Sequence, residues 1–408
     1  MNPKKIVILC LSWLSVNALS FESTQVLPEG VRNFNLRTVY TETDSKTDKQ
    51  GQIKPLAIDL WKPLKFKNII SGETGLKKKQ LEGLLIQQGW SPEDSVGDFY
   101  ANLDAQISVW APIFAYGVTS KLTIATALPI YSASTDISVG FKSNSGADKF
   151  IGALTDSKMS NYQSAVEAAR KMSEAPSRLN TKLVDNGYQQ LDKWQDTGLG
   201  DLQVIAKYLA YDGEVFKTTV SGGFVAPTGK TDDPAILTDL PFGDGQWDLI
   251  SQVILDQDIT PQLKINQFYK YTYQAPGNKE TRLKTAEESI EVELKEIDYK
   301  LGDKVDAGLS IQYEQASTGI QGGLGVIAFR KFSDTYETED LASKSELEKD
   351  STQEALYWAA KLGYSTVKAY GRGEFAAPLM ASIEYRKQQE SKNQPRTDFT
   401  QIDLKLFF

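Results

Sequence analysis

The chain has 408 residues and a mass of 45.3 kDa, with 40% hydrophobic and 24% charged residues, a net charge of −8, one cysteine and no histidine. Without histidine, every mechanism that needs an imidazole as general base, triad member or metal ligand is excluded. The mean hydropathy of −0.36 and the short apolar runs exclude a bundle of transmembrane helices, because each helix needs about 20 apolar residues.

Residues 1–20 have the pattern of a secretory signal peptide. Lys4 and Lys5 supply the positive start, residues 6–16 form the apolar centre, and small residues precede a cleavage site after Ser20. Cleavage there removes the only cysteine and changes the net charge from −8 to −10. An exported chain without disulfides is then periplasmic, secreted or an outer-membrane barrel. A lipoprotein site at Cys10 is the weaker alternative, because Leu9 stands where a small residue is expected.

Alternation of apolar and polar residues recurs along residues 21–408, as expected of strands with lipid on one side and water on the other. Residues 304–314 give the clearest run. The predicted strands are 31–42, 103–116, 121–142, 199–211, 214–227, 245–257, 261–275, 288–301, 304–316, 353–363, 366–388 and 397–408. The pattern predicts an all-β fold, a transmembrane antiparallel up-and-down β-barrel of about twelve strands.

The connections between these strands alternate in length. The tight connections are 117–120, 212–213, 258–260, 302–303 and 364–365, and the long ones are 43–102, 143–198, 228–244, 276–287 and 317–352. A soluble sandwich gives no reason for this alternation, whereas a barrel with both ends in the periplasm does.

Two of the long connections, 43–102 and 143–198, contain apolar residues at helical spacing, and we expect helical insertions in extracellular loops. Two interpretations stay open. The insertions either cover or plug the mouth of the barrel, or they form a solvated helix pair packed on its rim.

The C-terminal residues form an amphipathic strand that ends on an aromatic residue. Its apolar face is Ile402, Leu404, Leu406 and Phe408, together with Thr400, and its polar face is Gln401, Asp403 and Lys405. This end resembles the signal by which barrel proteins are recognised by their assembly machinery. The last strand of a soluble sandwich is the alternative.

Charged residues of both signs fall on the inward side of the predicted strands. The lumen-lining candidates are Asp201, Lys207, Lys217, Asp248, Lys264, Lys270, Glu291, Glu293, Asp306, Lys368, Arg372, Glu374, Asp403 and Lys405. They either pair across the lumen, the commoner case, or line a path through it. We expect no catalytic, cofactor-binding or metal-binding residues, although a barrel enzyme that uses Asp and Glu pairs stays a weak third option.

Two prolines interrupt consecutive predicted strands. Pro112 and Pro129 each remove a donor from the hydrogen-bond ladder of the wall. Together they predict either a lateral opening toward the bilayer or bulges tolerated near a rim.

Four short motifs carry a family resemblance: 116–122 (YGVTSKL), 127–129 (ALP), 198–202 (GLGDL) and 224–230 (FVAPTGK). They resemble the outer-membrane transporters of the meta-pathway of phenol degradation, which are grouped with the long-chain fatty-acid transporter superfamily. The resemblance covers roughly residues 105–408 and implies a channel for aromatic or other hydrophobic small molecules. The insertions 43–102 and 143–198 are not explained by it.

The sequence therefore predicts a monomeric, non-enzymatic barrel in the cell outer membrane that conducts small hydrophobic or aromatic molecules by passive diffusion. Its expected partners are outer-membrane lipid, the barrel-assembly machinery and the solute, and nucleic acid is not among them because the chain is acidic. The alternative is a plugged structural barrel whose outer loops bind a partner.

Overall fold

The computed structural model of the chain describes residues 21–71, 75–156, 174–283 and 293–408. The predicted signal peptide, residues 1–20, and Glu291 lie outside these ranges. No helix in the described residues is long and apolar enough to cross a membrane.

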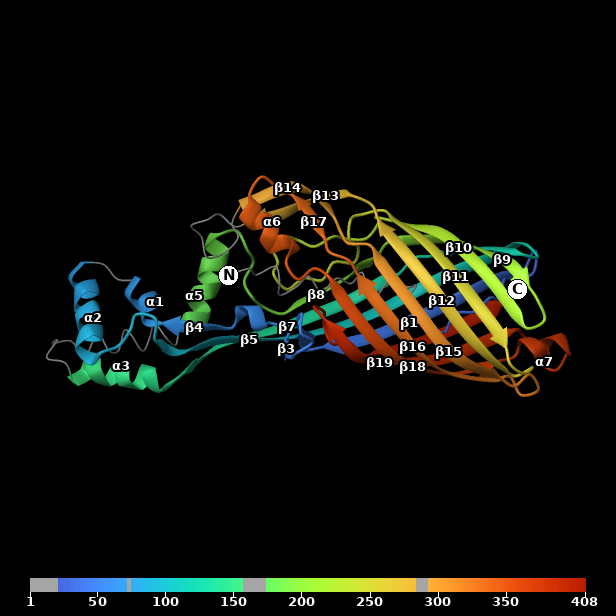
Figure 1. Cartoon of the computed structure of the whole chain (residues 1–408), viewed down its shortest axis with the longest axis horizontal. Coiled ribbons are helices and arrows are strands. Elements are labelled where there is room, and N and C mark those ends of the chain that lie inside the picture. The colour runs from blue at the N-terminus through green and yellow to red at the C-terminus, as the bar shows by residue number, and fades with distance from the viewer. Residues whose placement is uncertain (1–20, 72–74, 157–173, 284–292) are drawn as a thin grey trace.

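The described chain forms a closed antiparallel β-barrel (Figure 1). Its wall elements are β1 (Arg32–Thr43), β5 (Ser95–Thr119), β6 (Leu122–Ala127), β7 (Ile130–Ser143), β8 (Trp194–Leu199), β9 (Leu202–Asp212), β10 (Phe216–Ala226), β11 (Asp248–Asp258), β12 (Leu263–Gln274), β15 (Lys304–Glu314), β16 (Ile320–Lys331), β18 (Gln353–Ser365), β19 (Leu379–Lys392) and β20 (Phe399–Phe407). β6 with β7, and β8 with β9, are the halves of interrupted strands, which gives twelve strands in the described part. β1 closes the ring by pairing with both β5 and β20, so the predicted fold class is confirmed.

The side chains of each wall strand alternate between lumen and exterior because successive residues of a strand point to opposite faces. In β20, Gln401 and Asp403 are buried inside, whereas Ile402 and Leu404 are each 50% exposed on the outside. The apolar exterior is the face that a membrane barrel turns to lipid.

The two ends of the barrel differ in their connections (Figure 1). The short turns 120–121, 213–215, 259–262 and 315–319 lie at one end, together with residues 366–378, which contain α7 (Val367–Gly371). The first and last wall strands meet at this end, where the backbone N–H of Arg32 donates to the carbonyl of Phe408 at 2.7 Å. The long connections 44–94, 144–193, 227–247, 275–303 and 332–352 lie at the other end, which we call the loop end.

Both predicted insertions contain helices and emerge at the loop end. Their elements are β2 (Ser45–Thr47), β3 (Ile53–Pro55), η3 (Ile58–Leu60), β4 (Lys62–Lys65), α1 (Phe66–Ser71), α2 (Gly75–Gln88), α3 (Ser145–Asp156) and α5 (Ala175–Asp185). Residues of α1, α2 and α3 form a small apolar core around Phe66, Leu84 and Phe150, at the tip of a ribbon made by β4, β5 and β7. This tip stands away from the mouth, so it neither covers the lumen nor lies on the rim. α5 instead packs on the barrel, because Leu183 belongs to the same apolar cluster as Leu103 and Tyr131 of the wall.

The predicted eighth strand, 288–301, is not part of the wall. Within it, β14 (Glu293–Lys300) pairs with β13 (Gly277–Leu283) and β17 (Thr335–Glu337) in a separate three-stranded sheet, beside α6 (Leu341–Glu348). Ile297 and Tyr299 of β14 are buried in one cluster with Tyr336 rather than turned to lipid. Residues 302–303 therefore end a long connection and are not a tight turn.

Two further strand predictions were wrong. β16 was missed and assigned to a loop because Gly322, Gly323 and Gly325 lower its strand propensity. Residues 366–378 were assigned to a strand because they alternate, but they contain α7 and a turn at Gly373, which has φ of +73°. β19 begins only after Pro378, which itself lies outside the strand, so 364–365 is not a tight connection either.

Candidate lumen and vestibule site

The segment before the first strand, residues 21–31, lies inside the barrel. The backbone N–H of Gly30 donates to the carbonyl of Gly117 at 2.9 Å, which holds the segment at the short-turn end. Further in, the hydroxyl of Thr24 donates to the Asp256 carboxylate at 2.8 Å. This lumenal segment was not predicted from the sequence, because no strand or helix pattern marks it.

The innermost described residue of the lumenal segment fits against a glycine of the wall. A Cβ atom on Gly323 would lie 2.6 Å from the ring of Phe21, so this inward position has room for the ring only as glycine. The ammonium of Lys361 lies 5.8 Å from the ring centroid, close enough for a cation–π interaction. The glycine-rich sequence of β16 thus has a packing reason.

A cavity remains in the lumen beside this segment. Its polar lining includes Asn33, Asn35, Arg37, Lys207, Lys270 and Lys405. Its apolar lining includes Ile113, Ile205, Ile250 and Ile254. We call it the lumenal cavity.

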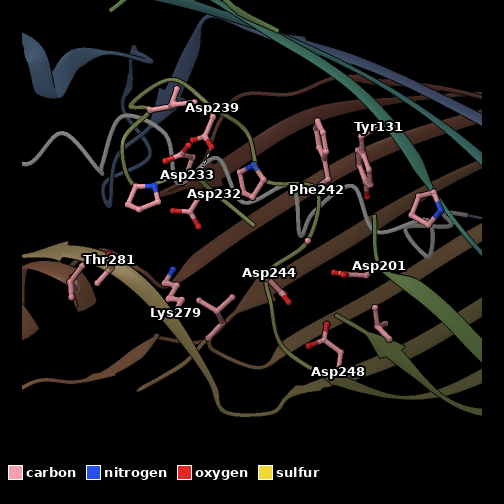
Figure 2. A pocket seen from close by; sticks show the side chains of 18 of the residues that line it. Tyr131, Asp201, Asp232, Asp233, Asp239, Phe242, Asp244, Asp248, Lys279 and Thr281 are labelled. Atoms are coloured by element: carbon pink, nitrogen blue, oxygen red, sulfur yellow. Dashed lines mark hydrogen bonds between the residues drawn. The ribbon is translucent and has the colours of Figure 1, made fainter. Parts of the chain in front are cut away.

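A second pocket, the vestibule pocket, lies at the loop end under the 227–247 connection (Figure 2). One wall of it is aromatic and contains Tyr131 and Phe242, whose rings stack with centroids 5.5 Å apart and planes 4° apart. Pro129, Pro241, Ile236 and Leu237 extend this apolar surface. A pocket of this kind accepts the apolar body of a small molecule.

Gln203 lines both the vestibule pocket and the lumenal cavity. It lies at the start of β9, is only 4% exposed, and its Oε1 atom has no hydrogen-bond partner in the described part of the chain. An unpaired buried amide is costly, because the group has lost its hydrogen bonds to water. Because it lines both cavities, Gln203 marks the boundary between them.

Six aspartates line the vestibule pocket, against two lysines, Lys279 and Lys304. Figure 2 separates the carboxylates into two groups: Asp232, Asp233 and Asp239 on one side, and Asp201, Asp244 and Asp248 on the other. The second group is partly neutralised because Lys304 lies 3.9 Å from Asp244 and 3.8 Å from Asp248. Sequence reasoning found only Asp201 and Asp248; the clue it missed was the density of aspartates in residues 232–248.

The environment of Asp239 reflects this excess of carboxylates. Burial raises the pKa of its carboxyl to about 7, and the nearby charges of Asp232 and Asp233 act in the same direction. A hydrogen bond from the backbone N–H of Asp233, at 2.6 Å, and the charge of Lys230 oppose the rise in pKa. The pocket thus holds negative charge at a cost that a bound cation would relieve.

Most of the charged residues predicted to line the lumen face inward, and several form the expected pairs. Lys270 contacts Asp306 at 2.8 Å, and Asp403 contacts Arg37 at 2.9 Å. Lys264 lies 3.3 Å from Asp256, which also binds the lumenal segment. Lys207 and Lys405 line the lumenal cavity, Asp201 and Asp248 line the vestibule pocket, and Lys217 is opposite Asp256 in the ladder.

Four other candidates do not line the lumen as predicted. Lys368 belongs to α7, and Arg372 and Glu374 follow it in an exposed ion pair of 2.6 Å. Glu293 begins β14 in the separate sheet, where it pairs with Lys295 at the surface. These errors follow from the two strand assignments corrected above.

The two prolines singled out from the sequence lie side by side at one level of the wall. Pro129 separates β6 from β7, and Pro112 in β5 accepts a long hydrogen bond of 3.3 Å from the N–H of Leu128. The neighbouring strand is interrupted at the same level, where the N–H of Gly200 donates to the carbonyl of Pro129 at 2.8 Å. The wall therefore has fewer hydrogen bonds between its strands beside the vestibule pocket, which Pro129 also lines.

No group of three or more acidic, His or Cys side chains arranged to hold a metal ion occurs within the described ranges.

Comparison with solved structures shows which known fold this barrel resembles. An outer membrane channel from Pseudomonas putida F1 aligns with 96% of this chain and 100% of its own, with a TM-score of 0.53 and 11% identity. The fold is that of an outer-membrane channel. The toluene transporter TbuX of Ralstonia pickettii (TM-score 0.34, 9% identity, 94% of this chain and 90% of its own covered) and a FadL homologue of Pseudomonas aeruginosa (TM-score 0.33, 7% identity, 93% and 90% covered) align less closely.

No family model and no curated protein matches the chain. The predicted resemblance is thus confirmed at the level of an outer-membrane channel fold, and the phenol-degradation transporter family stays a prediction.

Proposed function

We propose that this protein is an outer-membrane channel that takes up small, largely apolar molecules by diffusion. The observation that carries the proposal is the succession of two cavities inside one closed barrel, which meet at Gln203. A barrel that served only as a scaffold would have no need of adjoining cavities, since side chains can fill a lumen of this size.

The polarity of the lining supports an apolar solute. Stacked Tyr131 and Phe242 offer a flat apolar surface at the loop end, and isoleucines continue it in the lumenal cavity. Some of the buried charges of the lumen are neutralised in pairs, as for Lys270 and Asp306. Paired charges of this kind offer little to an anion or cation in transit.

The lumenal segment narrows the straight route to the short-turn end, and the thinned wall at Pro112 and Pro129 offers a second route. We propose that apolar solute leaves the vestibule pocket sideways between the interrupted strands. The interior of the bilayer is a favourable destination for such a solute, and no water-filled pore is then required. By the usual topology of these barrels, the loop end faces the cell exterior and both ends of the wall face the periplasm.

We further propose that the chain functions as a monomer held by outer-membrane lipid and inserted through its C-terminal strand by the barrel-assembly machinery. The outward side chains Ile402, Leu404, Leu406 and Phe408 suit both contacts, since all four are exposed on the apolar exterior.

A plugged barrel that binds a partner is the second candidate. The observation that favours it is the helical tip of α1, α2 and α3, which has its own apolar core and stands away from the mouth. Such a tip is suited to contacts beyond the membrane surface.

Reconstituted full-length protein separates the two candidates. Proteoliposomes that contain the barrel should take up a small radiolabelled aromatic such as toluene faster than empty liposomes, and planar bilayers should show a small ionic conductance. Neither uptake nor conductance in correctly folded protein would contradict the channel and favour the partner-binding barrel.

A further inference from the structure

Carboxylates dominate the unpaired groups of the vestibule pocket, beside one ammonium, Lys279, which lies over the ring of Tyr299. Asp201, Asp232, Asp233 and Asp239 have no lysine or arginine nitrogen within 4.0 Å among the described residues. Each of these side chains accepts hydrogen bonds when ionised and donates none. A ligand that satisfies them must therefore bring donors and positive charge.

Gln203 gives independent evidence that the pocket binds a ligand. Its side chain lies in the same pocket, is 96% buried by area, and makes no hydrogen bond in the described part of the chain. Asp201 directly precedes β9 and Gln203 is the second residue of β9, and both line the vestibule pocket. A ligand N–H placed between them would bond with the carboxylate and with the amide oxygen.

The aromatic wall of the pocket indicates what the rest of the ligand should be. Tyr131 and Phe242 are flat and apolar, and aromatic faces attract cations as well as rings. A metal ion does not fit this surface, and the described residues hold no metal-binding cluster. An inorganic cation would leave the aromatic wall without a partner.

We propose that the vestibule pocket binds organic amines: molecules with a protonated primary amine, held by Asp201 and Gln203, and an apolar or aromatic body against Tyr131 and Phe242. The inference goes beyond the proposed function, because it names a class of ligand that the vestibule pocket binds and not the apolar solute that enters the bilayer. The pocket is tested by binding alone.

Three probes with the same ring isolate the effect of charge: 2-phenylethylammonium, neutral 2-phenylethanol and anionic 3-phenylpropanoate. Their binding to the full-length barrel in detergent is measured by calorimetry, with protein-free detergent as the blank. We expect the amine to bind about tenfold more tightly than the alcohol, and the carboxylate most weakly, because the charge interacts with unpaired carboxylates in a partly buried site.

Asp201→Asn and Gln203→Leu are the informative variants. Asn can still accept the 2.8 Å hydrogen bond from the N–H of Gly229, so the local loop is preserved, and Leu fills the space of Gln without its amide. Both should reduce the preference for the amine over the alcohol several-fold. Asp212→Asn, which removes an exposed carboxylate at the short-turn end, is the matched control and should not.

Equal binding of the three probes, or unchanged amine preference in Asp201→Asn, would overturn the inference. The outcome is separable from that of the transport test. Selective amine binding without uptake would reject the channel and keep the site, whereas uptake of apolar solute without amine preference would reject the site and keep the channel. The shift in heat-dependent electrophoretic mobility shows that each variant barrel is folded.

Discussion

Thr24 binds the Asp256 carboxylate twice, through its hydroxyl at 2.8 Å and through its backbone N–H at 3.1 Å. Asp256 in turn lies 3.3 Å from the ammonium of Lys264. The wall of the barrel thus holds the lumenal segment through a buried, charge-assisted contact. Because the lumenal segment lies inside the barrel, its displacement would widen the lumen.

Removal of the Thr24 hydroxyl should loosen the lumenal segment. A hydrogen bond to a charged group contributes about 1.5–3 kcal/mol, so Thr24→Val should raise the fraction of displaced segments about tenfold or more. Single-channel recordings in planar bilayers should then show more frequent openings. Thr24→Ser, which keeps the hydroxyl, is the control and should behave like the natural protein; equal records for both variants would contradict this role.

A large side chain at the boundary of the two cavities should block the straight route through the lumen. Gln203→Trp is expected to lower ionic conductance at least about fivefold, because the narrowest part of a path sets its permeability, whereas uptake of an apolar solute that leaves the vestibule pocket sideways should persist. Gln195→Trp adds the same bulk at an exposed position of β8 and should have no effect. Unchanged conductance in Gln203→Trp would contradict a path for ions through both cavities.

Amine binding should depend on pH through Asp239. Because its pKa is raised to about 7, its carboxyl is largely neutral at about pH 5.5 and ionised at about pH 8. The amine stays protonated throughout, so 2-phenylethylammonium should bind more tightly as pH rises across this window. Asp232 and Asp233 raise the pKa further and Lys230 lowers it, and these neighbours make the transition broad.

The control for this pH effect is Asp239→Asn. Asn keeps an oxygen that can accept the hydrogen bond from the N–H of Asp233, but it does not titrate in this range. The pH dependence of binding should weaken in this variant, and the part that remains belongs to the other carboxylates of the pocket. A full pH dependence in Asp239→Asn would assign the transition to another group.

The outward C-terminal aromatic residue should matter for assembly rather than for transport. Phe408 is 59% exposed on the apolar exterior, so Phe408→Ala should lower the yield of folded barrel in the outer membrane several-fold, measured by heat-dependent mobility on gels. Phe332→Ala removes another exposed phenylalanine, 44% exposed at the loop end, and serves as control. Equal yields for the two variants would contradict a special role of the C-terminus.

The periodic strands could be predicted from the sequence because burial and exposure alternate residue by residue. This worked for β15 and β20, whose outward faces are wholly apolar. It failed for β16, where glycines are selected by the close contact of Phe21 with Gly323, a contact between residues about three hundred positions apart. Periodicity also fails to distinguish lipid from protein as the cover of an apolar face, which is why β14 was assigned to the wall.

The candidate site was less predictable than the fold. The alternation of the predicted strand 199–211 assigns Asp201 to the inner side, but the vestibule pocket is completed by the 227–247 connection, whose path no local pattern specifies. Asp232, Asp233 and Asp239 become a site only because that connection folds back over the barrel mouth. The lumenal segment was missed for the same reason: its partners Asp256 and Gly323 are distant in sequence.

A reversible lock across the interrupted strands tests the central claim most directly. Ile130 and Leu199 are cross-strand partners beside the break, and residues 21–408 contain no cysteine. Ile130→Cys with Leu199→Cys should form a disulfide, since cross-strand Cα atoms lie about 4.5–5.5 Å apart. Val253→Cys with Tyr269→Cys places the same lock in an uninterrupted part of the wall.

The measurement is uptake of a small radiolabelled aromatic by proteoliposomes before and after reduction of the disulfide. The account predicts slow uptake through the oxidised lock at the break, recovery on reduction, and no change for the lock between β11 and β12. Equal, fast uptake in all four states would contradict passage through the wall at Pro112 and Pro129, and no uptake in any state would contradict the channel itself.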